Sequence, residues 1–425
     1  MKKLIILSFI IFLILGGCET KVADDDTLRI MHAFDKKWQK PSVDWLKDIG
    51  KQFTKKHPKL KVKDIGVNWR EIDLRAYMDY KASISNDVIF TSPQYIPKHE
   101  KFGDCLELSK VKNWDKETEA DFDWNEVYTL SKKYAIPISV HARMCAYRKD
   151  IFKKHNITKL PRTLEELVEV GKKLTTDKMK GIGIYLGGDR ATAEVSFAPI
   201  LWNWDGKIFD EKTGKATFAN DAGIKTAQYI HDLIYKHKVT SPRMLKRKYK
   251  YDDFRKDFLD GKFAIAIGWG SYWLESLEKK GWIKGCYPPS RNAREVTVGF
   301  FPYPTKKQES FLSSWNLSIH KISSKKKEAM EIINMMVKAE NLAKCPEAKL
   351  LPPRKSMWNT PSYRTSFYQK WYKMLVNGRN VPKTIHYEEL RSYINVGLRR
   401  VLLEKKPLKE TLENLQSKFN NRYTE

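Results

Sequence analysis

The order of strands and helices expected along the chain indicates an α/β protein divided into two or three lobes. Short apolar strands alternate with amphipathic helices, which is the pattern of mainly parallel sheets covered by helices. The chain has 425 residues, more than one ordinary hydrophobic core accommodates. Hydrophobic residues make up 41% of it and aromatic residues 12%, a composition typical of a folded globular protein.

The first part of the chain is expected to form strand, helix, strand, helix, strand. We expect strands at 28–31, 60–67 and 87–90, a helix that is capped by Ser42 and ends before Pro58, and a helix at 70–84. The third strand is short and fully apolar, as in a strand buried within a parallel sheet. The loop at 91–95 follows its carboxyl end, which is where ligands bind in open α/β sheets.

Later segments continue the alternation without an internal repeat. Thr163 opens a helix with a capping-box pattern, in which its hydroxyl and the Glu166 carboxylate cap nearby backbone N–H groups. The remaining expected strands are at 134–140, 181–185, 262–267, 296–301 and 315–320, and the remaining expected helices are at 326–339 and over much of 363–420.

The N-terminal residues predict a lipoprotein signal. A basic start at Met1-Lys2-Lys3 precedes an apolar run at 4–15 and the sequence Leu15-Gly16-Gly17-Cys18. The run is shorter than the roughly 20 apolar residues that span a bilayer. We expect an exported protein whose Cys18 is lipidated as the new N-terminus, with 19–26 as a short tether. An uncleaved anchor or an ordinary signal peptide is the alternative.

The formal net charge of +28 favours anionic partners, including lipid head groups. Lysine and arginine are nevertheless spread along the whole chain and mixed with acids. The densest stretch, 243–250, is more typical of a solvated face than of a nucleic-acid site. We therefore expect no nucleic-acid partner.

Motifs for catalysis, metals and cofactors are missing from the sequence. It holds no Walker loop, no G-x-S-x-G and no H-E-x-x-H, and the glycines at 181–187 do not complete a dinucleotide fingerprint. Its nine histidines lack metal-ligand spacing. Four cysteines after Cys18 show no C-x-x-C, and either disulfides or isolated buried thiols remain open for Cys105, Cys145, Cys286 and Cys345. No enzyme activity, metal or cofactor is expected.

Three clusters of aromatic residues stand at expected loops. They are Trp202 with Trp204, then Trp269 with Tyr272 and Trp273, and finally Trp315 beside Asn316. Ser271 can cap the helix that follows the second cluster. Aromatic faces suit the C–H faces of sugar rings, while nearby amides and hydroxyls bind sugar hydroxyls. Sugar binding is favoured over the alternative, which is packing within or between lobes.

Five stretches resemble landmarks of one known family when taken in order. They are 134–143 with 147–150 (YAIPISVHAR and YRKD), 201–206 (LWNWDG), 258–264 (FLDGKFA), 314–319 (SWNLSI) and 351–354 (LPPR). Together they resemble the extracellular solute-binding proteins of ABC transporters, in the large sugar-binding family 1 that includes maltose-binding protein. The resemblance covers nearly the whole chain after the signal.

This resemblance implies a two-lobed periplasmic-binding-protein fold with hinged lobes and a ligand cleft between them. It also implies transfer of the solute to a membrane permease by a monomeric, non-catalytic receptor. The implied division is signal peptide 1–18, tether 19–26, first lobe 27–139 with 300–337, and second lobe 140–299 with 338–425.

The same resemblance implies where the ligand is contacted. The first-lobe loop contributes Gln94 and Tyr95, and Trp38 lies in the loop after the first strand. His141 occupies a crossover position that is often acidic in sugar binders. The remaining implied or aromatic contacts are Trp202, Trp204, Trp269, Tyr272, Trp273, Trp315, Asn316, Arg354 and Arg391.

The favoured interpretation is a lipid-anchored receptor for a sugar or oligosaccharide. His141 and Arg391 depart from the family pattern, and together with Arg354 and the positive net charge they suggest an anionic ligand. A receptor for an anionic solute such as a sugar phosphate or an acidic glycan is therefore the second interpretation. A surface glycan-degrading enzyme is the third, and nucleic-acid binding is the least favoured. The sequence leaves open which sugar, which transporter and which membrane are involved.

Overall fold

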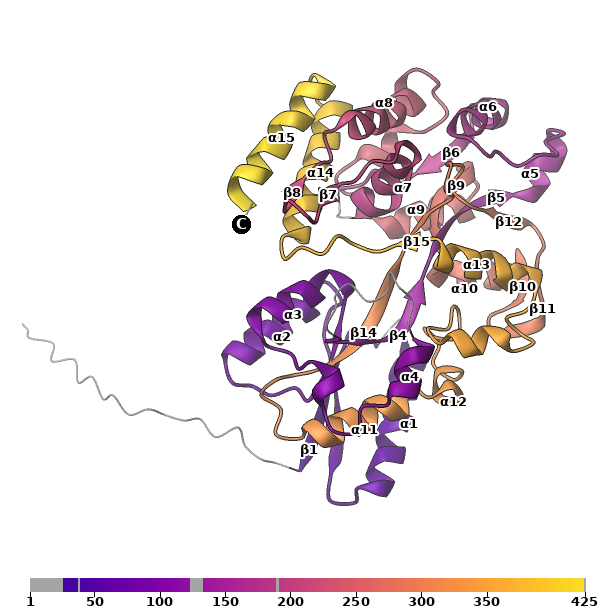
Figure 1. Ribbon diagram of the computed structural model, residues 1–425. Coiled ribbons are helices and arrows are strands. Elements are labelled where there is room, and N and C mark those ends of the chain that lie inside the picture. Colours follow the sequence, from indigo (N-terminus) through magenta and orange to yellow (C-terminus); the bar gives the residue numbers. More distant parts are fainter. Residues whose placement is uncertain (1–25, 37–38, 123–132, 189–190, 424–425) are drawn as a thin grey trace, which may run out of the picture.

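The structure, a computed structural model, describes residues 26–36, 39–122, 133–188 and 191–423. Its elements form two lobes, each built on a β-sheet flanked by helices (Figure 1). Buried apolar side chains fall into two separate clusters, one for each lobe. The predicted two-lobed α/β architecture is therefore confirmed. The expected signal, Cys18 and the tether up to residue 25 lie outside the described residues.

The first lobe contains a five-stranded sheet in the order β2-β1-β3-β14-β4. Its strands are β1 (Thr27–His32), β2 (Lys61–Gly66), β3 (Val88–Thr91), β4 (Ile136–His141) and β14 (Ser313–Ile319). Its helices are α1 (Lys40–Lys56), α2 (Ile72–Lys81), α3 (Ile96–Phe102), α4 (Lys116–Asp121), α11 (Lys326–Met336) and α12 (Ala339–Leu342). The short strand β3 is buried along its whole length, as its apolar sequence predicts.

The second lobe contains a four-stranded sheet in the order β12-β5-β9-β6. Its strands are β5 (Arg143–Arg148), β6 (Lys180–Ile184), β9 (Phe263–Gly270) and β12 (Val298–Phe301). Its helices are α5 (Lys149–Lys154), α6 (Leu164–Leu174), α7 (Ala198–Leu201), α8 (Asp221–Tyr235), α9 (Tyr251–Leu259), α10 (Leu274–Lys279), α13 (Ser366–Val376), α14 (Tyr387–Leu402) and α15 (Leu408–Tyr423). In Figure 1, α8, α14 and α15 gather at the end of this lobe that is remote from the first-lobe helices α1 and α11.

Short elements connect these parts. The short strands are β7 (Phe209–Asp210), β8 (Lys215–Ala216), β10 (Ile283–Cys286), β11 (Pro289–Glu295), β13 (Ser310–Phe311) and β15 (Gly378–Arg379). The 3₁₀ turns are η1 (Pro93–Tyr95), η2 (Leu108–Lys110), η4 (Trp202–Trp204), η5 (Pro242–Leu245), η6 (Ser271–Trp273) and η7 (Lys355–Asn359), and η3 (Ala193–Phe197) is a π-helical turn.

Both main sheets are mixed, which corrects the expectation of mainly parallel sheets. Strand β1 pairs in parallel with β2 and β3, but β14 runs antiparallel between β3 and β4. Strand β6 is parallel to β9, while β5 is antiparallel to both β9 and β12. The physical reason is that β14 and β5 enter their sheets from the opposite lobe, so no βαβ crossover sets their direction.

Two expected helix caps are wrong in detail. Helix α1 begins at Lys40, and Ser42 is buried inside its first turn instead of capping it. The Pro41 ring, favoured in the first helical turn, starts the helix two residues earlier. Ser271 does not cap η6, because strand β9 continues to Gly270 and buries the serine beside the first lobe.

The chain passes between the lobes at a short crossover, which we define as His141, Ala142 and Arg143. Strand β4 of the first sheet ends at His141 and strand β5 of the second begins at Arg143. Later, Tyr303 packs in the second-lobe core and Leu317 in the first, so the chain returns between them. The lobe boundaries expected from the sequence stay predictions.

All four cysteines in the described part of the chain are free and buried, at Cys105, Cys145, Cys286 and Cys345. Of the two possibilities left open, isolated thiols are therefore observed. Within the described ranges, no helix combines the length and apolar character needed to cross a membrane.

The capping of α6 gives a test of the fold. The Thr163 hydroxyl accepts a hydrogen bond from the Glu166 N–H at 3.1 Å, as the sequence predicts. Thr163→Ala should lower the free energy of unfolding by about 1 kcal/mol, because one N–H at the helix start loses its acceptor. Thr163→Ser keeps the hydroxyl and should stay within a few tenths of a kcal/mol of wild type. Urea unfolding measures both; equal stability of the alanine and serine variants would contradict the cap.

Candidate ligand-binding site at the crossover

The crossover brings four strands of the two sheets together. His141 pairs with Ser313 at the start of β14, and Arg143 pairs with Gly270 at the end of β9. The Ser271 N–H donates to the Ala142 carbonyl at 3.0 Å, which fixes the turn after β9 against the crossover. Side chains from both lobes therefore meet here at the carboxyl ends of β4 and β9, where α/β sheets bind ligands.

The predicted aromatic platform divides into a buried and an accessible part. Trp269 is fully buried, with its ring 4.9 Å from both the Phe258 and Trp273 rings. Tyr272 is half-buried, and its ring meets the His141 ring edge to face at 5.5 Å. Trp273 is 9% exposed and lies behind Tyr272 at 5.3 Å. Tyr272 is thus the ring of this cluster best placed to stack on a ligand.

His141 is an uncharged polar group at the junction. The side chain is 6% exposed, with Nε2 3.4 Å from the Ser139 hydroxyl and Nδ1 3.5 Å from the Ser271 hydroxyl. Burial, helped by the nearby Arg143 charge, lowers the pKa of His141 to about 3. At neutral pH the imidazole therefore offers one donor and one acceptor and carries no charge.

Arg143 is a functional candidate that the sequence reasoning did not single out. Its side chain is 5% exposed, and Nη1 donates to the Phe311 carbonyl at 3.0 Å and approaches the Ser313 hydroxyl at 3.5 Å. Its Nε is buried without a hydrogen-bond partner. The feature of the sequence that could have identified Arg143 is its position two residues after His141, in the expected crossover.

The two other basic candidates already have ion-pair partners. Arg391 donates from Nη1 to Glu194 at 2.7 Å and from Nη2 to a Glu388 oxygen at 2.6 Å. Arg354 pairs with Asp121 at 2.6 Å. In this structure both guanidinium groups are occupied by the protein itself, so neither is brought to the crossover as a free charge.

The first-lobe loop follows β3, whose neighbour β14 also pairs with the crossover strand β4. Gln94 and Tyr95 form the 3₁₀ turn η1 directly after that strand and are both partly exposed. Asn316, on β14, donates its side-chain N–H to the Thr91 carbonyl at 3.2 Å and so ties β14 to the start of this loop. Asn316 is therefore a buried support, whereas Gln94 and Tyr95 are accessible to a ligand.

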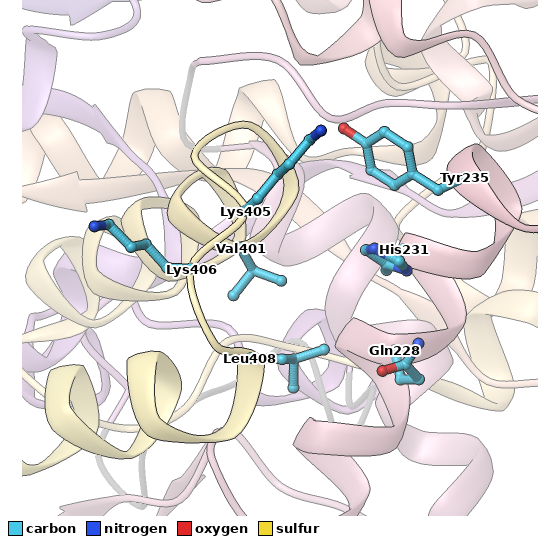
Figure 2. A pocket seen from close by; sticks show the side chains of 7 residues that line it. All are labelled: Gln228, His231, Tyr235, Val401, Lys405, Lys406 and Leu408. Carbon is cyan, nitrogen blue, oxygen red and sulfur yellow. The ribbon is translucent and has the colours of Figure 1, made fainter.

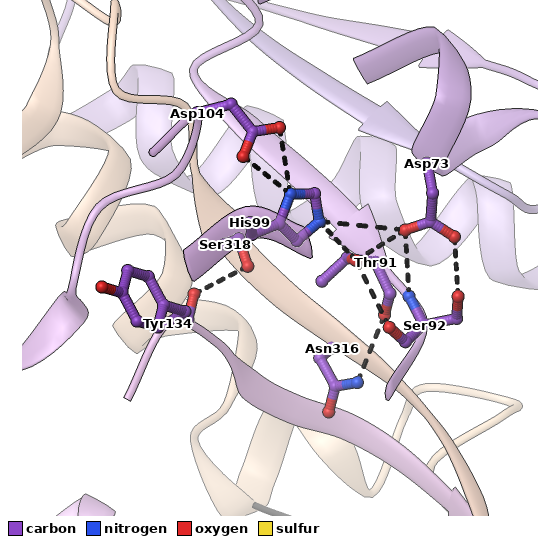
Figure 3. Close-up of polar contacts among 8 residues, drawn as sticks. All are labelled: Asp73, Thr91, Ser92, His99, Asp104, Tyr134, Asn316 and Ser318. Atoms are coloured by element: carbon purple, nitrogen blue, oxygen red, sulfur yellow. Dashed lines mark hydrogen bonds and ion pairs between the residues drawn. The ribbon is translucent and has the colours of Figure 1, made fainter. Parts of the chain in front are cut away.

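A buried polar network holds this loop in place (Figure 3). Both Asp73 oxygens accept hydrogen bonds at 2.6 Å, one from the Thr91 hydroxyl and one from the Ser92 hydroxyl. The His99 ring lies between Thr91, 2.8 Å from Nε2, and Asp104, 3.0 Å from Nδ1. The network thus joins the start of α2, the end of β3, helix α3 and the segment after α3.

His99, Asp104 and Cys105 also have the atom types of a metal site, with their ligand atoms within 4.8 Å of one another. Burial by itself would lower the pKa of His99, but Cys105 and Asp104 raise it well above its ordinary value. Both ring nitrogens already have protein partners, Asp104 and Thr91. The arrangement is that of a structural network around a histidine that favours its protonated form.

The remaining candidates from the sequence are four tryptophans, of which three contact other parts of the protein and one lies outside the described residues. Trp202 is buried beneath the Arg379 guanidinium at 5.2 Å, and Trp204 meets the Tyr229 ring at 6.5 Å. Trp315 is half-buried against the first-lobe core. Trp38 falls on a residue that the structure does not describe.

A separate groove of about 410 Å³ lies on the second lobe between α8 and the turn that joins α14 to α15 (Figure 2). It is lined by Gln228, His231, Tyr235, Val401, Lys405, Lys406 and Leu408. None of these residues belongs to the crossover, and the sequence reasoning did not identify this groove.

Comparison with known proteins shows what the chain is similar to. Residues 39–343 match the family described as bacterial extracellular solute-binding protein. The diacetylchitobiose binding protein DasA of Streptomyces coelicolor is 26% identical over 69% of this chain, and the match spans just under two thirds, 65%, of that protein. A probable ABC transporter-binding protein of Deinococcus radiodurans is 22% identical over 68% of this chain and 70% of its own length.

Solved structures share the two-lobed fold. The GacH receptor of Streptomyces glaucescens has a TM-score of 0.76 at 19% identity, covering 93% of this chain and 98% of that one. Maltose-bound MalE3 of T. maritima has a TM-score of 0.73 at 21% identity, covering 93% of this chain and 99% of that one. At these identities the likeness shows the fold alone.

The buried His141 predicts an acid-sensitive junction. In the unfolded chain the imidazole has its ordinary pKa of 6.5 and becomes protonated as the pH falls through that value, whereas in the folded protein its pKa is about 3. The unfolded state thus binds one more proton within this window, and stability falls as the pH falls. From pH 7.5 to 5.0 this group should remove about 2 kcal/mol of unfolding free energy.

Urea unfolding at the two pH values tests this prediction. His141→Asn should lose about 2 kcal/mol less than wild type over the interval, since asparagine does not titrate. Thr163→Ser, which changes no titrating group, should keep the wild-type pH dependence. If wild type and His141→Asn lost the same unfolding free energy between the two pH values, the His141 imidazole would not be held neutral in the folded protein.

Proposed function

The chain belongs to the bacterial extracellular solute-binding proteins, and on that premise we propose that it is the receptor of an ABC importer that captures a sugar or oligosaccharide between its two lobes. Membership confirms the resemblance drawn from the sequence motifs and places the chain among binding proteins and not among enzymes. The observation that carries the proposal is the half-buried Tyr272 ring beside His141, at the junction of both sheets.

The chemistry of the junction supports a sugar. Tyr272 offers an aromatic face for the C–H side of a sugar ring, with Trp273 behind it. From the first lobe, Gln94 and Tyr95 offer an amide and a phenol for hydroxyl groups. The descriptions of similar proteins also favour a sugar ligand, since they name diacetylchitobiose, acarbose or maltose as the bound molecule. We leave the fully buried Trp269 out of the proposed contacts.

Capture would proceed by hinge closure around the crossover. A ligand drives such a motion only through its stronger binding to the closed form. In the closed form the ligand would touch the turn after β3 in the first lobe and the turn after β9 in the second lobe at the same time. Opening would break one of these two sets of contacts, so the ligand would bind the closed form more strongly. A monomer that hands its solute to a membrane permease completes the proposal.

We also propose that Cys18 carries a lipid that holds the receptor near its permease. The support is the N-terminal sequence alone, with its basic start, short apolar run and Gly16-Gly17-Cys18. A tether of about eight residues would keep the first lobe within roughly 30 Å of the membrane surface when fully extended.

A substitution on the platform tests the sugar site. Tyr272→Ala should weaken binding of the protein's sugar about 10- to 100-fold, which is the loss of one stacking face and its buried area. Tyr235→Ala, in the separate groove of Figure 2, is the matched control and should bind as wild type does. Tryptophan fluorescence titration and thermal shift with a broad sugar panel measure both. Loss of binding in Tyr235→Ala but not in Tyr272→Ala would move the ligand to that groove.

The anchor is tested in bacterial cells. The wild-type chain should sediment with membranes and incorporate radioactive palmitate, whereas Cys18→Ser should do neither. Sugar binding should be equal in both forms, because Cys18 precedes in the sequence the residues expected to form the two lobes. Wild-type protein that remains soluble and unlabelled would contradict lipidation without affecting the receptor proposal.

A further inference from the structure

We propose that Arg143 binds an anionic group of the ligand, so that the captured solute is a sugar carrying a carboxylate. The inference rests on the proposed receptor function and narrows its substrate class. It is carried by a guanidinium that is 5% exposed at the crossover and has no ion-pair partner among the residues that the structure describes.

The hydrogen bonds of Arg143 go to neutral groups and leave one of its donors unused. A guanidinium presents five N–H donors. Here Nη1 donates to two neutral oxygens, the Phe311 carbonyl at 3.0 Å and the Ser313 hydroxyl at 3.5 Å. The Nε donor is buried with no partner. The Tyr272 side chain is a further neutral partner within hydrogen-bonding reach of the guanidinium. The unused Nε donor lies on the Nε–Nη2 edge, with which guanidinium groups bind carboxylates bidentately.

An unpaired buried charge is expensive. Removing an ion from water costs several kcal/mol even after relaxation, and a counter-charge normally offsets part of this cost. Besides its neutral hydrogen-bond partners, the Arg143 guanidinium has two aromatic rings nearby, with its carbon 5.1 Å from the Phe311 ring and 5.9 Å from the Tyr272 ring. Cation–π contacts at these distances return a small part of the cost. An anionic ligand would supply the rest, and only when it is bound.

The nearby acids are committed elsewhere. The Glu194 carboxylate is near enough to raise the pKa of Arg143 by its negative charge. It accepts hydrogen bonds, however, from Arg391 at 2.7 Å and from Tyr387 at 3.0 Å. Glu388 is likewise held by Arg391. These two carboxylates are balanced in part by Arg391, and neither reaches ion-pair distance of Arg143. The side facing His141 adds no charge, because that imidazole is neutral.

The position of Arg143 suits a sugar acid. Its guanidinium shares the junction with Tyr272, so one ligand could stack its ring on the phenol and place a carboxylate on the arginine. A single buried cation balances one negative charge, which favours a carboxylate over a phosphate dianion. The Ser313 hydroxyl, near Nη1, is a further donor within reach of an anion.

Paired sugars that differ only in charge test the inference. The probes are glucuronic acid with glucose, galacturonic acid and its trimer with galactose and its trimer, glucose 6-phosphate, and inorganic phosphate alone. Isothermal titration and thermal shift on the full chain should show binding of an acidic sugar at least 30-fold tighter than its neutral partner. Affinity should fall as salt rises, since an ion pair forms.

Variants of Arg143 separate a binding role from a structural one. Arg143→Met should lose at least 30-fold in affinity for the acidic sugar while the melting temperature of the ligand-free protein stays equal or rises, because an uncompensated buried charge is removed. Arg143→Lys keeps the charge but not the fork and should retain intermediate affinity. Arg400→Gln removes an exposed charge of the same sign and should change nothing.

The binding and melting results distinguish a ligand-binding role of Arg143 from a structural one. Acidic preference that Arg143→Met abolishes supports the inference. Equal binding of neutral and acidic partners overturns it but leaves the sugar receptor intact. Binding of phosphate or glucose 6-phosphate in place of the sugar acids overturns the carboxylate assignment. Failure of every probe overturns both proposals, and a ligand-free Arg143→Met protein that melts much lower than wild type shows that the arginine is structural.

Discussion

The structure depends on one constraint, the passage of the chain between its two sheets within a single residue, Ala142. Because β4 ends and β5 begins on either side of it, His141 and Arg143 are forced into the junction. Strand β14 and the turn after β9 then close around them through Ser313 and backbone bonds. Polar groups in a buried junction are held rigidly and are poorly solvated by water. Their hydrogen bonds to a ligand are therefore strong, and a ligand that leaves them unpaired binds weakly.

The first-lobe loop that we propose to face this junction is held by side-chain hydrogen bonds of its own. Asp73, at the start of α2, fixes both Thr91 and Ser92, and His99 extends the network to Asp104. The turn that carries Gln94 therefore rests on side-chain bonds at distances of 2.6–3.0 Å. A binding loop on a rigid scaffold loses little entropy when a ligand arrives. Both sides of the proposed cleft are thus preorganised.

Local sequence patterns predicted the elements well and the roles of individual side chains less well. The apolar run of β3 and the Thr163 cap were readable because each depends on neighbouring residues. The Glu388–Arg391 spacing of three residues could have indicated an ion pair, but Glu194 lies 197 positions away. Arg143 could not be recognised as unpaired, since its partners Phe311 and Ser313 are 168 and 170 residues distant. Mixed sheets escaped prediction for the same reason.

The central claim is that the crossover is where the solute binds. The most direct test is a crystal structure of the protein with the sugar that most raises its melting temperature. We expect density for the sugar between the lobes, in contact with Tyr272 and with groups of η1. A sugar bound instead in the groove between α8 and α15, with the crossover free of ligand, would contradict the account.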